Sequence, residues 1–334
     1  MTGRAVTAPV DLLVVGDCNP DVLVLGDDVT PEFGQHEKLV RSISLVVGGS
    51  AAITAVAAAR LGLRVALAAT IGADPAGEFM LGQLASEGVD TSAITVRDGR
   101  ATGMTVALAQ ARPQAGAGDR AILTATGAMT SLTASDVPRD LLAAARHVHV
   151  SSYFLLEQSL GPGLAGLLGA ARAHDATTSL DTNWDPVGRW GDAQLRAALA
   201  HTDILLPNEE EALLLSGEPA LDAAVAALTN AGPAVVVKLG ARGAMCAADG
   251  QIDCIAPPPR LDGPFVDATG AGDCFNAGLI AGLLRGLDLP AAARLGCAAG
   301  SASTRAAGGT AAAPDLPTAL RLAAIAKSAP ATGS

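Results

Sequence analysis

The chain has 334 residues, a formal net charge of −11 and a hydrophobic content of 50%, yet aromatic residues make up only 2% of it. The acidic balance argues against nonspecific binding to nucleic acids or membrane surfaces, because both need an excess of Lys and Arg. The longest apolar stretch, 51–71, is interrupted by Arg60, Gly62 and Arg64, so we expect no membrane span. The start of the chain lacks a secretory signal pattern, and we expect a cytoplasmic protein.

A core with so few aromatic residues must be built from Ala, Val, Leu and Ile, which suits parallel strands covered by Ala-rich helices. Strand-like and helical runs alternate almost throughout, as in a doubly wound, mainly parallel α/β sheet with helices on both faces. We expect one domain over 1–330, with a last helix after Pro314 and a frayed tail at 331–334. We predict strands at 11–15, 64–70, 147–151, 178–181, 203–206 and 234–239, and helices at 51–61, 75–87, 161–174, 193–201, 209–215, 222–231, 273–285 and 290–304.

Two regions depart from this alternation. In 22–47 and 102–124, polar and apolar residues alternate, which is typical of antiparallel strands with one open face. The first region lies between the opening strand and the first helix, so we expect the two to project from the sheet as a small β lid. Asp119 and the Gly and Ala before it predict an exposed hairpin loop. Open edge strands on such a lid favour pairing with a second copy, so we expect a homodimer through the lid.

The cysteines and two of the histidines carry no pattern of a metal or disulfide site. The odd number of cysteines and the absence of a CxxC pair fit reduced thiols, and we interpret all five as packing residues. His147 and His149 share one face of a predicted strand, but no further ligand is near in sequence, so we interpret both as structural. The cysteines are Cys18, Cys246, Cys254, Cys274 and Cys297.

The segment DATGAGD, 267–273, joins a turn of small residues to a carboxylate at the start of an apolar, helix-periodic run. Gly270, Ala271 and Gly272 leave the backbone bare enough for several N–H groups to point at one anion, and the helix dipole adds positive charge there. Asp273 would repel that anion unless it had a chemical task, and taking a proton from an attacking hydroxyl fits. The structural alternative is an Asp that stabilises the first helical turn.

Two motifs lie in the first fifty residues. VVGDCNPDVLV places Asn19 and Asp21 just after the first strand, where a simple Asn-Pro-Asp turn is the structural alternative. VVGGSAAIT places Gly48 and Gly49 at the entry to a helix, at the base of the expected lid. Paired glycines there permit both a hinge movement and the close approach of a ligand.

Two further motifs precede DATGAGD. LLPNEEEA contains Asn208 and Glu211, which taken alone would be the capped start of a helix. VVVKLGARGA contains Lys238, Gly240 and Gly243 after a strand, and taken alone it would be an ordinary turn.

In this order the five motifs resemble those of the ribokinase-like (PfkB-type) carbohydrate kinases, and the resemblance covers nearly the whole chain. It implies the ribokinase-like fold and phosphoryl transfer from ATP to a hydroxyl. Asp273 would act as general base, and the amides of 270–272 would hold the negative charge of the transferring phosphate. Asn19 and Asp21 would hold the hydroxyls of a sugar substrate.

The resemblance also implies the positions of the ions and the nucleotide. Asn208 and Glu211 would organise the water around Mg²⁺. Asp267 and Thr269, with carbonyls of a loop at 303–311, would bind a monovalent cation, for which potassium is the expectation. The nucleotide would contact Asn208, Lys238, Gly240, Gly243 and Gly272.

Departures from the family pattern limit which acceptor substrates we expect. Ile53 stands where ribokinases have an Asn, and it cannot hydrogen-bond a sugar hydroxyl. LDTNWDP resembles the Asp-x-Asn-x-Arg element of ketodeoxygluconate kinases, but Asp185 replaces the Arg that would meet a substrate carboxylate. Lys and Arg are scarce near the motifs, which disfavours a phosphorylated sugar. A neutral hexose, pentose or polyol fits best.

Other functions remain open or are excluded. A nucleoside kinase on the same scaffold would stack a base on an aromatic ring, for which Phe33, Tyr153, Phe154 and Trp184 are available. A catalytically silent sugar sensor is a further alternative, against which the intact Asp273 argues. A dinucleotide-dependent oxidoreductase is excluded by the absence of GxGxxG after the first strand, and a P-loop NTPase by the absence of GxxxxGK[ST].

Overall fold

The computed structural model describes residues 10–110 and 120–325, and their main element is a nine-stranded sheet of order β13-β12-β11-β10-β9-β8-β1-β4-β5. Its strand pairs are parallel except β11/β12 and β12/β13, which are antiparallel. The predicted mainly parallel sheet is therefore present. The strands are β1 (Val10–Val15), β4 (Val65–Gly72), β5 (Ile94–Arg97), β8 (Ala145–Ser151), β9 (Thr177–Asp181), β10 (Ile204–Leu205), β11 (Ala234–Lys238), β12 (Ala244–Ala248) and β13 (Gln251–Ala256).

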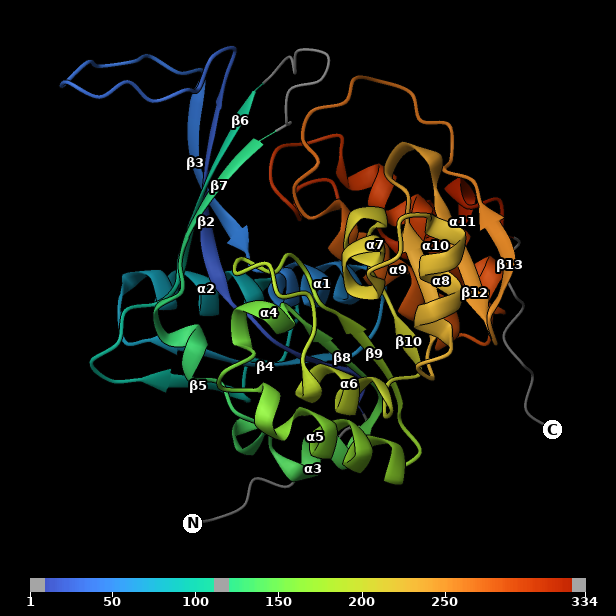
Figure 1. Cartoon of the computed structure of the whole chain (residues 1–334). Helices are drawn as coiled ribbons and strands as arrows, with labels where there is room; N and C mark the ends of the chain where they lie inside the picture. The colour runs from blue at the N-terminus through green and yellow to red at the C-terminus, as the bar shows by residue number, and fades with distance from the viewer. Residues whose placement is uncertain (1–9, 111–119, 326–334) are drawn as a thin grey trace.

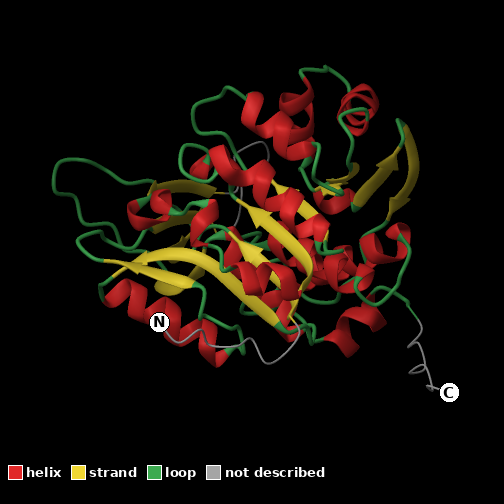
Figure 2. Cartoon of the chain, turned by 90° about the horizontal axis from the view of Figure 1, so that it is seen from below, coloured by secondary structure: helices red, strands yellow, loops and turns green. Residues whose placement is uncertain are grey.

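Helices cover both faces of this sheet, and each face has its own apolar core (Figure 2). Successive residues of β1 point to opposite cores, with Leu12 in one and Leu13 in the other, as the pleat of a strand requires. One face carries α1 (Ser50–Arg60), α2 (Pro75–Ser86), α9 (Ala271–Leu283), α10 (Leu289–Ser303) and α11 (Leu316–Leu322), and the other α3 (Arg139–Ala144), α4 (Tyr153–Leu156), α5 (Gly161–Ala173), α6 (Ala193–Leu199), α7 (Glu209–Ser216) and α8 (Leu221–Thr229).

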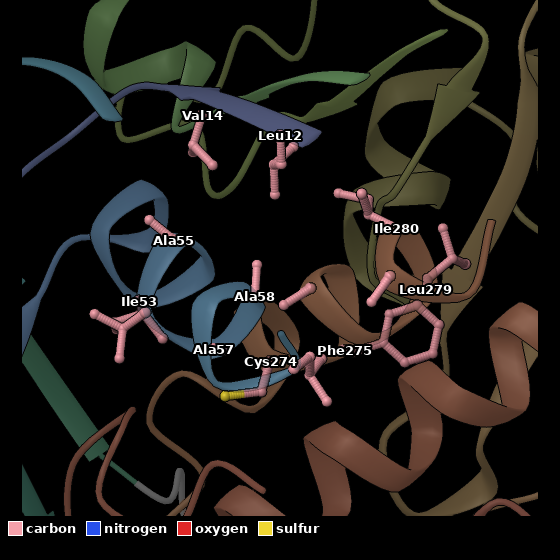
Figure 3. Packing of buried hydrophobic residues seen from close by; sticks show 14 of the residues in the cluster. Leu12, Val14, Ile53, Ala55, Ala57, Ala58, Cys274, Phe275, Leu279 and Ile280 are labelled. Carbon is pink, nitrogen blue, oxygen red and sulfur yellow. The ribbon is translucent and has the colours of Figure 1, made fainter. Parts of the chain in front are cut away.

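Small side chains let the helices of the first face approach closely. Figure 3 shows Leu12 and Val14 of β1 lying over the alanine-rich surface of α1 and the apolar side chains of α9. A Cβ on Gly278 of α9 would lie 2.7 Å from the Leu295 carbonyl oxygen of α10. A Cβ on Gly300 of α10 would lie 2.7 Å from the Ala271 carbonyl oxygen, at the start of α9. This packing holds the DATGAGD turn against the body of the protein.

All the predicted helices and strands are present, with ends shifted by a few residues. The added elements are short or peripheral: β5, β12, β13, α3, α4 and the 3-10 turns η1 (Gly127–Ser131), η2 (Ala134–Asp136) and η3 (Gly240–Arg242). Within 10–110 and 120–325 no single helix is long and apolar enough to cross a bilayer, and only the bent pair α7 and α8 passes that test jointly. The hairpin loop predicted at Asp119 and the tail at 331–334 lie outside the described residues.

A second sheet projects from the body as the expected lid (Figure 1). Its order is β3-β2-β6-β7, with β2 (Asn19–Gly26), β3 (Ser42–Gly48), β6 (Met104–Gln110) and β7 (Arg120–Ala125). The outer pairs β2/β3 and β6/β7 are antiparallel, as predicted. The middle pair β2/β6 is parallel, and this pairing is possible because a long crossover through α1, β4, α2 and β5, not a hairpin, leads to β6. Among the described residues, the buried apolar cluster of the lid consists of Leu23, Ala107 and Ala109.

Candidate active site

A cavity of about 790 Å³ lies between the lid and the loops that follow the parallel strands. Ligands of open α/β sheets bind in this position, outside the carboxyl ends of the strands. Of the residues predicted from sequence, the cavity is lined by Asn19, Asp21, Gly49, Asn208, Glu211, Lys238, Gly240, Thr269, Gly270, Gly272 and Asp273. Three further predicted residues do not line the cavity but support residues that do: Gly48, Asp267 and Ala271. Gly243 does not line the cavity either.

Asp21 and Asn19 form a hydrogen-bonded pair on the lid side of the cavity. Asn19 Nδ2 donates to Asp21 Oδ1 at 3.1 Å and to Thr105 Oγ1 of β6 at 3.2 Å. Burial, followed by the negative charge of Asp17, raises the pKa of Asp21 to about 7. A Cβ on Gly48 would overlap the Asp21 carboxylate. Gly48 is therefore needed for the position of this carboxylate, which suits hydrogen bonding to hydroxyls.

The start of α1 depends on a carboxylate that the sequence analysis did not single out. Gly49 has a φ of +79° and offers no side-chain cap to the helix. Asp17 replaces that cap, since its two oxygens accept hydrogen bonds from the amides of Ser50 and Ala51 at 3.0 Å each. Asp17 also lines the cavity, and burial raises its pKa. An Asp after a strand and far from the helix it caps leaves no local sequence signal.

Asp273 lies in the first turn of α9 and is only 8% exposed. Burial, followed by the charge of Asp181, raises its pKa to about 8, while Lys238 and a hydrogen bond from Ser50 act in the opposite direction. A carboxyl group with a pKa near neutrality is suited to exchange a proton during a reaction.

The turn before Asp273 is held by internal hydrogen bonds. Asp267 Oδ1 accepts hydrogen bonds from the amide and hydroxyl of Thr269, and Asp267 Oδ2 accepts one from the Gly308 amide at 2.8 Å. The loop at 303–311 therefore meets the turn through Gly308. The Ala271 amide donates to the Ala268 carbonyl at 3.1 Å. Of the three small residues, Gly270 and Gly272 thus keep amides that form no hydrogen bond within the described chain, and both line the cavity.

Lys238 provides a buried positive charge behind this turn. Its Nζ lies 2.6 Å from Asp181 Oδ2, which also accepts a hydrogen bond from Asn276 of α9 at 2.6 Å. A Cβ on Gly272 would be 3.6 Å from the same Nζ. Burial alone would lower the pKa of Lys238, but Asp181 and Glu211 raise it, so the lysine stays charged. It offsets negative charge both at the carboxylates and at any anion on the turn.

Asn208 and Glu211 form the capping box that their spacing allows. Asn208 Oδ1 accepts a hydrogen bond from the Glu211 amide, and Glu211 Oε2 accepts one from the Asn208 amide, each at 2.8 Å. Burial, followed by the charge of Asp181, raises the pKa of Glu211 to about 7. Glu211 Oε1 forms no hydrogen bond within the described residues, and Glu211 lines the cavity. This oxygen is therefore available to a hydrated cation.

The two glycines after β11 differ in their surroundings. Gly240 lines the cavity and has a φ of +57°. Gly243 has a φ of +92° and does not line the cavity. It directly precedes β12 and lies against the carbonyl of Ala256 at the end of β13. The geometry gives Gly243 a structural task in the turn.

The aromatic residues considered for ligand stacking separate clearly. Phe33 is 98% exposed, Tyr153 and Phe154 are buried, and only Trp184 lines the cavity, with 52% of its surface exposed. Trp184 is held edge-to-face by Trp190, with ring centroids 4.9 Å apart. An exposed aromatic face at the wall of a cavity can stack on an apolar ligand face.

The neighbouring acidic residue Asp185 is 1% exposed and does not line the cavity. Its carboxylate accepts hydrogen bonds from the amides of Val187, Arg189 and Trp190. Asp185 therefore shapes the loop that presents Trp184. Asn183 lies in the same loop with a φ of +56° and donates to the hydroxyls of Ser50 and Ser152.

Arg120 and Ile53 complete the walls of the cavity. Ile53, which stands where the sequence analysis placed the Asn of ribokinases, packs against Gly309 and so joins α1 to the loop at 303–311. Arg120, at the start of β7, was missed by the sequence analysis because a single Arg next to a loop has no distinguishing pattern.

Comparison with known proteins agrees with the fold and the motifs. The family model described as pfkB family carbohydrate kinase matches residues 10–316. The chain is 30% identical over 286 residues to 2-dehydro-3-deoxygluconokinase from Bacillus subtilis, covering 82% of this chain and 85% of the relative.

Among solved structures, adenosine kinase from Sinorhizobium meliloti superposes with a TM-score of 0.82 at 23% identity, covering 94% of this chain and 99% of its own. A protein assigned as ribokinase II from E. coli, solved with ATP and Mg²⁺, gives a TM-score of 0.78 at 24% identity, covering 94% and 98%. At these identities the structures establish the shared fold only. The family match establishes more: this chain belongs to the pfkB family of carbohydrate kinases and is a phosphotransferase.

Proposed function

We propose that this kinase transfers the γ-phosphoryl group of ATP to a hydroxyl group of a neutral sugar or polyol, with Asp273 as general base. One observation carries the proposal: a buried Asp273 with a raised pKa shares a cavity with the hydrogen-bonded pair Asn19 and Asp21 and with Gly270 and Gly272 of the DATGAGD turn. Such a cavity brings together an acceptor site, a base and an anion site.

In this proposal Asp21 and Asn19 orient the acceptor hydroxyl toward Asp273, which takes its proton as the new O–P bond forms. The Gly270 and Gly272 amides, at the positive end of α9, hold the oxygens of the phosphoryl group as its bond to ADP breaks. Positioning and electrostatics supply most of the rate in such reactions. Glu211 Oε1 would accept hydrogen bonds from water around Mg²⁺, which keeps much of its hydration shell.

A monovalent cation site beside the turn is part of the same proposal. Asp267 and Thr269, with carbonyls of the loop at 303–311, would form it. The hydrogen bond from Gly308 to Asp267 supports contact between these two segments. Potassium dependence of the turnover rate would test this site.

A nucleoside acceptor is the second candidate. Trp184, exposed on the cavity wall and supported by Trp190, is the observation that favours it, because a nucleobase presents a large flat face for stacking. The similarity in fold to an adenosine kinase is compatible with this candidate.

We also propose a homodimer through the lid and a single domain for the chain as a whole. Apolar side chains on the outer strands of the lid support the first proposal: Ile43, Leu45 and Leu123 are between 47% and 65% exposed. Pairing of two lids would remove such a surface from water. Light scattering at micromolar concentration tests it, and a monomer would contradict it.

The decisive experiment measures ADP release from ATP with neutral sugars, sugar acids, sugar phosphates and nucleosides, for the wild type and Asp273→Asn. Turnover of a neutral sugar that the substitution abolishes is the expected result. Turnover of a nucleoside would replace the first candidate with the second. Equal rates in wild type and variant would exclude Asp273 as the base.

A further inference from the structure

A second cavity, of about 240 Å³, shares one loop with the active-site cavity. The loop at 182–191 leads from β9 to α6. Asn183 and Trp184 of this loop line the active-site cavity, whereas Thr182 and Trp190 line the second one. The same loop therefore borders both cavities, and a ligand in the second could act on the first.

The second cavity is mainly apolar, and its size suits a small molecule. Its lining includes leucines from four elements, α6, β10, α7 and α8: Leu195, Leu199, Leu205, Leu215 and Leu228. Its volume lies near the lower end of the range for ligand pockets, about 300–1,000 Å³. A molecule with one ring or a short branched chain fits such a space, and a nucleotide does not.

Two polar side chains at this cavity have no partner within 10–110 and 120–325. Thr182 is fully buried, and its Oγ1 forms no hydrogen bond there, which is unfavourable for a buried hydroxyl. Arg196, exposed on α6, forms no ion pair among the same residues, and the described lining contains no carboxylate. Asp192, one turn before Arg196, instead accepts hydrogen bonds from the Leu195 amide and the Tyr153 hydroxyl.

We propose that the second cavity binds a small organic acid with an apolar body, and that this ligand strengthens binding of the acceptor. The leucines surround the body, the Arg196 guanidinium binds the carboxylate, and Thr182 Oγ1 gains the hydrogen bond that it lacks. A cation without a carboxylate beside it favours an acid over an amine. The site is independent of the proposed function, and only its effect on the acceptor rests on that function.

Trp190 connects the second cavity to the acceptor side of the first. Its ring lies edge-to-face with that of Trp184, with centroids 4.9 Å apart, and its amide donates to Asp185 Oδ2 at 2.8 Å. Trp190 has a φ of +52°, a conformation that bulky residues rarely adopt and that stores strain. A ligand packed against Trp190 holds this ring, and through it Trp184, in place. Acceptor binding then orders less of the loop, so the KM of the acceptor should fall.

Tryptophan fluorescence tests the site directly, because the chain has two tryptophans, Trp184 and Trp190. Phenylacetate is the probe, phenylacetamide its neutral analogue, and acetate the acid without an apolar body. We expect a saturable change with phenylacetate that is half complete below about 1 mM. Both analogues should bind about tenfold more weakly or worse, since each lacks one of the two matching features.

Three variants locate the bound probe. Arg196→Gln should weaken phenylacetate binding by about tenfold or more, and Thr182→Val by roughly 2- to 13-fold. Arg139→Gln is the matched control, because Arg139 is exposed on α3 and lines neither cavity, and it should match wild type. No saturable change up to about 10 mM phenylacetate would overturn the site. Equal affinities in wild type, Arg196→Gln and Thr182→Val would overturn it as well.

The effect on the acceptor is measured with the substrate that the screen identifies. Phenylacetate at about ten times its dissociation constant should lower the acceptor KM by about fivefold in wild type and Arg139→Gln, and by less in Arg196→Gln. An unchanged KM in wild type with phenylacetate bound would overturn this effect. Absence of turnover with every acceptor would count against the proposed function, and the fluorescence titrations would still decide the site.

Discussion

The DATGAGD turn and the lid face each other across one cavity but are built in opposite ways. The turn leads into α9, which packs tightly against α10. Within the turn, Asp267 accepts hydrogen bonds from Thr269 and from Gly308 of the loop at 303–311. The lid, as far as 10–110 and 120–325 describe it, has a buried cluster of three residues and exposes apolar side chains on its outer strands. The tightly packed turn suits a reaction that needs fixed geometry, and the sparsely packed lid suits substrate entry and selection.

The sharpest way to test this contrast is Asp273→Asn. Because the substitution removes the proposed general base, it should lower kcat by about 10²–10⁴-fold. Steady-state kinetics with the acceptor found by the substrate screen measures it. Asp253→Asn is the control, because Asp253 lies exposed on β13 and should leave the rate unchanged. A loss below tenfold would place the base elsewhere.

The same substitution predicts an effect of pH on stability. Since burial raises the pKa of Asp273 to about 8 in the folded protein, from 3.8, the folded state binds more protons than the unfolded state between these values. The contribution of Asp273 to stability is therefore complete below pH 3.8 and is lost as the pH rises to 8. Asp273→Asn should be more stable than wild type at pH 8, by at least about 1 kcal/mol. Urea denaturation at pH 5 and pH 8 measures the difference, which should shrink at the lower pH.

A change in the packing of α10 against α9 should reduce the stability of the whole protein. Gly300→Ala places a Cβ 2.7 Å from the Ala271 carbonyl oxygen, and overpacking of this kind costs about 1–3 kcal/mol. Gly166→Ala on α5 is the matched control, since a Cβ there meets nothing within 4 Å and should be neutral or stabilising. Equal unfolding temperatures for the two variants would contradict close packing at α9 and α10.

A change at the base of the lid should instead weaken acceptor binding. In Gly48→Ala the new Cβ displaces the Asp21 carboxylate, and loss of a hydrogen bond to a charged group corresponds to roughly a tenfold rise in the KM of the acceptor. Gly82→Ala on α2, where a Cβ meets nothing within 4 Å, is the control. A normal KM in Gly48→Ala would show that Asp21 does not hold the acceptor.

The smallest expected effect is that of Trp184→Ala. An aromatic pair contributes about 0.5–1.5 kcal/mol, so the loss of the Trp184 ring should raise the KM of the acceptor by roughly 2- to 13-fold. Trp184→Phe should retain most of the affinity. Phe33→Ala, on an exposed residue away from the cavity wall, should have no effect. A larger loss with nucleosides than with sugars would favour the nucleoside candidate.

Much of the cavity could be predicted because its motifs are local. The turn at 267–273 combines glycines, a carboxylate and a helix start within seven residues, and Asn208 with Glu211 forms a capping box within four. Asp17 and Arg120 could not be found in this way. Their partners are 33 and 149 positions away, and no short pattern records such contacts.

The sequence by itself determined the alternation of strands and helices, the lid segments and the turn of small residues with a carboxylate at the start of α9, because these depend on periodicity, turn residues and neighbouring side chains. Only the tertiary structure decided the parallel pairing of β2 with β6, the burial that raises the pKa of Asp273, and the exposure of Trp184 beside the buried Tyr153 and Phe154. These properties depend on segments far apart in the chain, and strand pairing and desolvation exist only once those segments are packed together.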